Sequence, residues 1–205
     1  MLVLRKVLGY TTLGLLLGAC LFGAISKFTV NGGLPALFQS LRDVQSILSF
    51  LSSWVFELIF FVIIGIMSIV ALATFHKKDD VAQEGKLQNL LLLYAICELA
   101  AAITMIAAYV AVYKDISHVD AKMWMWAIFP VILIIATIVR KAAFVGKNTM
   151  AARIMGACTF LLMAILVIIL GFSNPLFNLY PLTQVLFLIT FFCGCGFNVV
   201  SIFKK

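Results

Sequence analysis

Residues 54–75 read WVFELIFFVIIGIMSIVALATF, a run in which Glu57 is the one charged residue. A helix needs roughly 20 apolar residues to cross about 30 Å of hydrocarbon, so this run is long enough to span a bilayer. A strand of a membrane barrel would alternate apolar with polar residues, and this run does not alternate. The run therefore predicts a transmembrane helix, and it sets the fold class for the rest of the chain.

Further apolar runs lie on both sides of this one, and the overall composition agrees with them. Of the 205 residues, 64% are hydrophobic and 11% are charged, whereas soluble domains carry about 25% charged residues. We therefore predict an all-α polytopic membrane protein, with residues 1–205 forming a single domain built as a bundle of about six transmembrane helices. The predicted spans are residues 7–26, 54–75, 88–113, 123–140, 155–172 and 182–203.

The basic residues set the predicted orientation, because Lys and Arg are enriched in cytoplasmic loops. With the N-terminus inside, most of the 15 Lys and Arg residues fall in inner segments, and the outer segments hold Lys27, Arg42, Lys114 and Lys122. Tryptophan prefers the membrane interface, and the predicted outer boundary holds Trp54, Trp124 and Trp126. We expect both termini to be cytoplasmic, in a bacterial cytoplasmic membrane.

An amphipathic segment follows the first predicted span. After breaks at Gly32-Gly33 and Pro35, apolar residues recur at helical spacing through residues 36–52, with polar residues between them. This pattern predicts a helix that lies in the outer interface of the membrane. The helix is interpreted either as a simple surface helix or as a lid over an outward-facing cavity.

The first apolar run contains Leu17-Gly18-Ala19-Cys20, which resembles the cleavage site of a bacterial lipoprotein signal. The chain stays apolar through Leu21-Phe22-Gly23-Ala24, where a lipoprotein turns polar. We therefore expect this segment to be retained as the first span.

Glu98 is the most informative residue of the sequence. It lies ten positions after Gln88, which places it about 15 Å deep, near the bilayer centre. An ionisable group at that depth costs about 2.5–3.5 kcal/mol on insertion scales and often marks a site or a proton path. We expect Glu98 either to be protonated and hydrogen-bonded to a neighbouring helix or to face a wet cavity. Its candidate partners are Tyr94 one turn earlier, Thr190 at a similar depth, and Thr159 nearer the inner side.

Glu57 gives a weaker signal. It lies three residues past Trp54, about 5 Å below the outer boundary, so its side chain can snorkel to water. If residues 36–52 form a lid, Glu57 would line the mouth of the cavity beneath it. The predicted substrate-binding residues are therefore Glu98, Tyr94, Thr159, Thr190 and Glu57.

Two further features suggest contact with other molecules. Gly14 and Gly18 are four residues apart, and Ala19 and Gly23 repeat that spacing. Small residues at this interval let helix backbones approach closely, either within the bundle or against a separate membrane protein. The inner segment 140–153 is purely basic, which favours contact with anionic lipid or docking of a cytoplasmic partner.

No motif of the sequence nominates a catalytic site, a cofactor or a metal. Cys193 and Cys195 are two positions apart, so on a helix they point to nearly opposite sides and do not easily share a metal. His76 and His118 fall on opposite sides of the predicted membrane. Neither a phosphate-binding loop nor a catalytic triad is present. Nucleic-acid binding is not predicted, because the basic residues lie between apolar runs rather than on one face.

In size, span count and orientation the chain resembles the substrate-binding membrane subunits of energy-coupling-factor vitamin transporters. The Gly14–Gly18 stripe is similar to the helix-packing motif that those subunits present to their partner. The first predicted function is a transport component that binds a small solute in a cavity near Glu98. The alternative is a non-transporting membrane partner, which regulates or anchors another protein through the small-residue stripe and the basic segment 140–153.

Overall fold

A computed structural model describes residues 2–43, 47, 50, 53–75, 80–114, 116–144, 149–171 and 181–203. Within these residues, six helices are long and apolar enough to cross a membrane. The prediction of an all-α chain with six apolar helices of membrane-spanning length is therefore confirmed for the described residues. The bounds of the helices are α1 Leu2–Val30, α4 Trp54–Phe75, α5 Asp80–Tyr113, α6 Ala121–Ala143, α7 Met150–Leu166 and α8 Pro181–Ile202.

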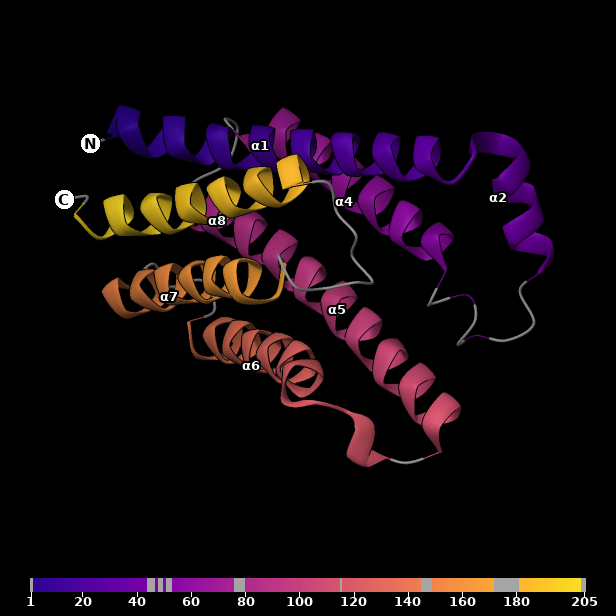
Figure 1. The fold of residues 1–205 in the computed structure, drawn as a ribbon. Helices are drawn as coiled ribbons and strands as arrows, with labels where there is room; N and C mark the ends of the chain where they lie inside the picture. The colour runs from indigo at the N-terminus through magenta and orange to yellow at the C-terminus, as the bar shows by residue number, and fades with distance from the viewer. Residues whose placement is uncertain are drawn as a thin grey trace.

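The six helices form a bundle in which both chain termini lie at the same end (Figure 1). We call this end the terminal end and the opposite one the far end. Contacts between helices run in the order α4, α1, α8, α7, α6 and α5, and α5 also contacts α4. Figure 1 shows α5 running obliquely to α1 and α8 rather than alongside them. The side of the membrane on which the terminal end lies stays a prediction.

The observed helices extend beyond several of the predicted spans. Helix α4 agrees with the predicted range, whereas α5 begins at Asp80 rather than at Gln88, and α1 runs from Leu2 to Val30. The residues added at the start of α5 include Gln83, Glu84 and Lys86, which are good helix formers. An apolar run marks where a helix enters hydrocarbon, and the backbone helix continues past that point. This extension places Glu84 inside a helix.

Helix α2, Gly33–Arg42, follows directly on α1. Gly32 and Gly33 adopt φ values of 94° and 70°, a left-handed conformation that glycine tolerates without strain. The chain can therefore turn sharply here. Helix α2 covers part of the predicted segment 36–52; residues 44–46, 48–49 and 51–52 of that segment lie outside the described residues. The location of α2 at an outer membrane face stays a prediction.

A cluster of aromatic rings packs the middle of the bundle. The Tyr94 ring of α5 lies 5.7 Å from Phe60 of α4, and 5.0 and 5.2 Å from Phe187 and Phe191 of α8. Such pairs contribute about 0.5–1.5 kcal/mol each beyond the burial of their area. In a bilayer, helices are held by close packing rather than by a hydrophobic driving force. These rings therefore hold α4, α5 and α8 together at the level of Tyr94.

Candidate functional site

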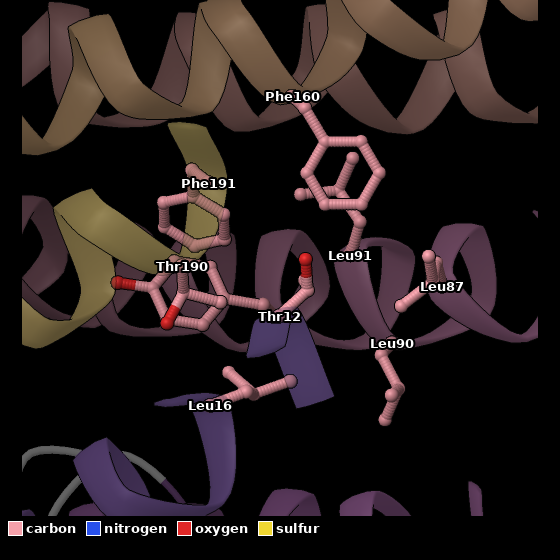
Figure 2. A pocket seen from close by; sticks show the side chains of 9 residues that line it. Thr12, Leu16, Leu87, Leu90, Leu91, Phe160, Thr190 and Phe191 are labelled. Atoms are coloured by element: carbon pink, nitrogen blue, oxygen red, sulfur yellow. The ribbon is translucent and has the colours of Figure 1, made fainter. Parts of the chain in front are cut away.

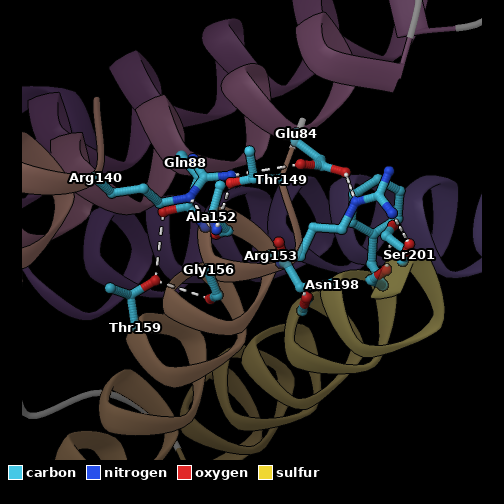
Figure 3. Close-up of polar contacts among 12 residues, drawn as sticks. Glu84, Gln88, Arg140, Thr149, Ala152, Arg153, Gly156, Thr159, Asn198 and Ser201 are labelled. Carbon is cyan, nitrogen blue, oxygen red and sulfur yellow. Dashed lines mark hydrogen bonds and ion pairs between the residues drawn. The ribbon is translucent and has the colours of Figure 1, made fainter. Parts of the chain in front are cut away.

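Four buried charged side chains meet at the terminal end of the bundle. Glu84 Oε1 lies 3.7 Å from Arg5 Nη2 of α1 and 3.4 Å from Arg153 Nε of α7. Glu84 Oε2 lies 3.5 Å from Arg140 Nη2 of α6. The four residues are between 1% and 9% exposed. We call Arg5, Glu84, Arg140 and Arg153 the Glu84 cluster; Figure 3 shows Glu84 with Arg140 on one side and Arg153 on the other.

Hydrogen bonds extend the Glu84 cluster to the two remaining helices. Arg5 Nε donates to Ser201 Oγ of α8 at 2.7 Å, and Arg5 Nη1 donates to Gln83 Oε1 at 3.1 Å. Gln83 Nε2 in turn donates at 2.8 Å to the carbonyl of Phe75, the last residue of α4. Arg153 Nη1 also donates to the carbonyl of Ser201. The cluster and these neighbours therefore join all six spanning helices at one end.

The burial of these arginines was not foreseen from the sequence. Arg5, Arg140 and Arg153 were treated as charges of inner segments, and residues 140–153 as a basic surface for lipid or a partner. Instead, Arg140 and Arg153 are buried and turn into the bundle toward Glu84, whereas Lys141 is exposed. Arg140 lies in the last turn of α6 and Arg153 in the first turn of α7, so both can reach inward. The positions of these two arginines at helix ends, rather than in the middle of a loop, were the sequence feature that could have indicated their burial.

A second polar group lies one turn deeper than Glu84. Thr159 Oγ1 donates to the carbonyl of Gly156 at 2.8 Å and lies 3.3 Å from Gln88 Oε1, and Gln88 is fully buried. A Cβ on Gly156 would meet the side chains of both Asn198 of α8 and Gln88. Thr159, a predicted partner of Glu98, thus contacts Gln88 instead. Gln88 lies ten residues before Glu98 on α5.

Glu98 has the partner on its own helix that its spacing predicted. The side chains of Tyr94 and Glu98 lie close enough to interact, and Glu57 of α4 interacts electrostatically with Glu98. Tyr94 is 3% exposed, whereas Glu98, one turn toward the far end, is half-buried. The terminal side of Glu98 is therefore packed, and Ala101, Ala102 and Met105 further along α5 are buried as well.

Glu57 forms an ion pair with Lys27 of α1, and each of the two side chains is 12% exposed. The pair exists because α1 extends to Val30 and carries Lys27 within the helix, facing α4. The sequence interpretation assigned Lys27 to an outer segment and let Glu57 snorkel to water, and it did not foresee this pair. Glu57, Glu98 and Lys27 together carry one net negative charge when both carboxyl groups are ionised.

Thr190 lines a small cavity near the aromatic cluster (Figure 2). Tyr94 also lines this cavity. The cavity has a volume of about 10 Å³, which is roughly the space that one water needs. The Thr190 hydroxyl donates to the Leu186 carbonyl of its own helix at 2.7 Å. This cavity therefore has no room for a solute, and Glu98 is not among its lining residues. The remaining walls come from Thr12, Leu16, Leu87, Leu90, Leu91, Phe160 and Phe191.

The small residues of α1 divide into two faces. A Cβ on Gly23 would lie 2.9 Å from the Phe61 ring, and Ala19 is fully buried, so this part of the stripe packs inside the bundle. A Cβ on Gly14 or Gly18 would meet no described atom within 4 Å. Packing within the bundle therefore accounts for Ala19 and Gly23 but not for Gly14 and Gly18.

The described residues form an all-helical fold with six helices long and apolar enough to cross a membrane, which suggests an integral membrane protein. No protein-family model, curated protein or solved structure matches this chain. The likeness to vitamin-transporter subunits stays a prediction.

Proposed function

We propose that the chain is a transport component that receives a small solute at Glu98. The observation that carries this proposal is a half-buried carboxyl group near the middle of helix α5, with the buried Tyr94 one turn away. Among the described residues Glu98 makes no ion pair. Lys27 is paired with Glu57 instead. Ionisable groups at this depth typically face a bundle interior or a water-filled path. Glu98 is therefore the best candidate for a solute or proton site.

The charges around Glu98 indicate which solutes the site favours. Glu57 is paired with Lys27, and Glu98 interacts electrostatically with Glu57 but has no described ion pair of its own. A positive group would be attracted there, and the low dielectric of the membrane strengthens that attraction. The site therefore suits a small amine, or a proton that moves together with a solute.

We propose that a solute enters from the far end, because aromatic rings fill the other side of Glu98. On the terminal side of Glu98, the buried Tyr94 ring and its aromatic neighbours fill the bundle. The small cavity there has a volume of about 10 Å³, and the Glu84 cluster closes the bundle beneath it. Release toward the terminal end would require these contacts to separate, as in alternating access around a midplane site.

Glu98→Gln tests the proposed role of this carboxyl group. We expect proteoliposomes with this variant to lose uptake of small amines across the pH range, because the amide can neither carry a negative charge nor release a proton. The matched control is Ser68→Ala, which removes a buried hydroxyl on α4 that donates to the Ile64 carbonyl of its own helix. If Glu98→Gln transports amines and protons as the unmodified protein does at every pH, the proposal is wrong.

A second candidate function is a non-transporting subunit that docks another membrane protein on α1. Gly14 and Gly18 favour it, because no described atom of the chain occupies the space beside them and such spacing lets a second helix approach closely.

Gly14→Leu and Gly18→Leu test this second function. We expect a partner that co-purifies from the source membrane to be lost, since the larger side chains would hold the two helices apart. Gly14→Ala and Gly18→Ala keep small residues at both positions and should retain the partner. Partner retention by the leucine variants would exclude docking on this face.

A further inference from the structure

One side of α2 packs against the bundle. The partly shielded residues of this helix recur at helical spacing, and they are Gly33, Ala36, Leu37 and Ser40. Ser40 Oγ accepts a hydrogen bond of 3.0 Å from the Trp54 indole of α4. A Cβ on Gly33 would lie 3.7 Å from the Phe28 ring of α1. Residues three and four apart share a helix face, so this face is the one that contacts α1 and α4.

A second face of α2 is apolar and exposed. Leu34, Phe38 and Leu41 follow one another at spacings of four and three residues, and they are between 46% and 61% exposed. A lid over a cavity of this bundle would bury its apolar face against the other helices. Instead, no residue of α2 is buried, and the apolar face is separate from the face that contacts α1 and α4. The structure therefore favours the surface-helix interpretation of this part of the predicted segment 36–52.

The third face of α2 holds polar side chains. Gln39 and Arg42 lie three residues apart on it and both are exposed. The helix thus has one face toward the protein, one apolar face and one polar face. Amphipathic helices at a membrane surface keep the polar face in water and bury the apolar face about 5–10 Å into the boundary between headgroups and acyl chains. The two exposed faces of α2 match that arrangement.

The place of α2 in the fold puts it at the level of this boundary. The 29 residues of α1 correspond to about 44 Å, so this helix extends beyond about 30 Å of hydrocarbon. Figure 1 shows α2 turning off the line of α1 at the far end. Ile25 and Val30 at the end of α1 are exposed, so exposed apolar side chains continue from the spanning helix onto α2.

We propose that α2 is an interfacial anchor whose Leu34, Phe38 and Leu41 insert into the lipid at the membrane surface. Arg42 in the last turn of α2 then lies at the level of the lipid headgroups, where a basic side chain is attracted to anionic lipid. The bond from Trp54 to Ser40 fastens this anchor to the first residue of α4.

The test identifies the phase around single spin labels on α2, with the full chain reconstituted in liposomes of phosphatidylethanolamine and phosphatidylglycerol. Phe38→Cys and its matched control Gln39→Cys are made in a background whose five native cysteines are replaced by alanine. Molecular oxygen concentrates in lipid, whereas a nickel chelate stays in water. We expect the ratio of oxygen to nickel accessibility to be severalfold higher at the Phe38 position than at the Gln39 position, because the two lie on different faces.

Every other occupant of the apolar face gives a different result. High nickel accessibility at the Phe38 position would place this face in water. Low accessibility to both reagents would place it under protein, either another segment of this chain or a second copy. Both results would overturn the proposal.

A second measurement needs no cysteine replacement. The unmodified chain is reconstituted in the same liposomes with a phospholipid that carries a photoreactive diazirine in its acyl chain. Cross-links should map to Leu34, Phe38 or Leu41, and Gln39 should carry none. An α2 without any cross-link would also contradict the proposal. Neither measurement depends on transport at Glu98.

Discussion

Glu84→Gln is expected to lower the free energy of unfolding by about 3–5 kcal/mol, the range found when one partner of a buried ion pair is removed. The change leaves Arg5, Arg140 and Arg153 buried without their shared carboxylate. The lost carboxylate lies where hydrogen bonds and ion pairs join all six helices, so the whole bundle should be destabilised. Reversible unfolding in mixed micelles, followed by circular dichroism, measures it.

Glu57→Gln is the control for this experiment. Glu57 also forms an ion pair, but with one partner, Lys27, nearer the far end of the bundle. We expect that loss to be clearly smaller, because no cluster of like charges is left behind. The double variant Glu84→Gln/Arg140→Gln should lose less than the sum of its single changes, since the two residues contact each other. Equal losses for Glu84→Gln and Glu57→Gln would show that the cluster does not stabilise the bundle.

Gly9→Leu is expected to have the second largest effect, a loss of about 3 kcal/mol or more, at or above the upper end of the usual overpacking range. A Cβ on Gly9 would lie 2.5 Å from the Phe75 ring, and Phe75 is fully buried. That ring cannot easily move, because it packs against Tyr10 and Phe197. The same unfolding measurement in micelles applies.

Gly14→Leu makes the same chemical change on the same helix, five residues further along. The space beside Gly14 is open to the described residues, and replacing glycine within a helix favours the helix by up to about 1 kcal/mol. The isolated chain should therefore be unaffected or slightly more stable. Similar losses for the two leucine variants would mean that the two faces of α1 are assigned wrongly.

The sequence predicted the spanning helices well because their signal is local. Residues 54–75 are bounded by polar residues, and α4 has the same bounds. The start of α5 was missed, since Glu84 and Lys86 ended the apolar run without ending the helix. Composition locates the hydrocarbon boundary, whereas backbone hydrogen bonding determines the length of the helix.

In the candidate site too, contacts within one helix could be predicted from the sequence, whereas contacts between helices could not. The Tyr94–Glu98 contact was predictable, because residues four apart share a helix face. The Lys27–Glu57 pair depends on how α1 is rotated against α4, which no local pattern specifies. The Glu84 cluster needs four helices in register, and its arginines also fit the rule that places basic residues in cytoplasmic loops. That rule accounts for the position of such residues in the chain but not for the direction of their side chains.

The length of α5 links the protein to the thickness of its membrane. Its 34 residues correspond to about 51 Å at the usual helical rise, and its apolar stretch from residue 88 to residue 113 alone corresponds to about 39 Å, longer than the roughly 30 Å of a hydrocarbon core. A helix that is too long for its bilayer tilts, and the tilt grows as the bilayer thins. Glu84 and Glu98 both lie on α5, so a tilt of α5 would displace both residues relative to the shorter α4. A change in the acyl-chain length of the lipids would therefore shift both charged regions of the bundle at once.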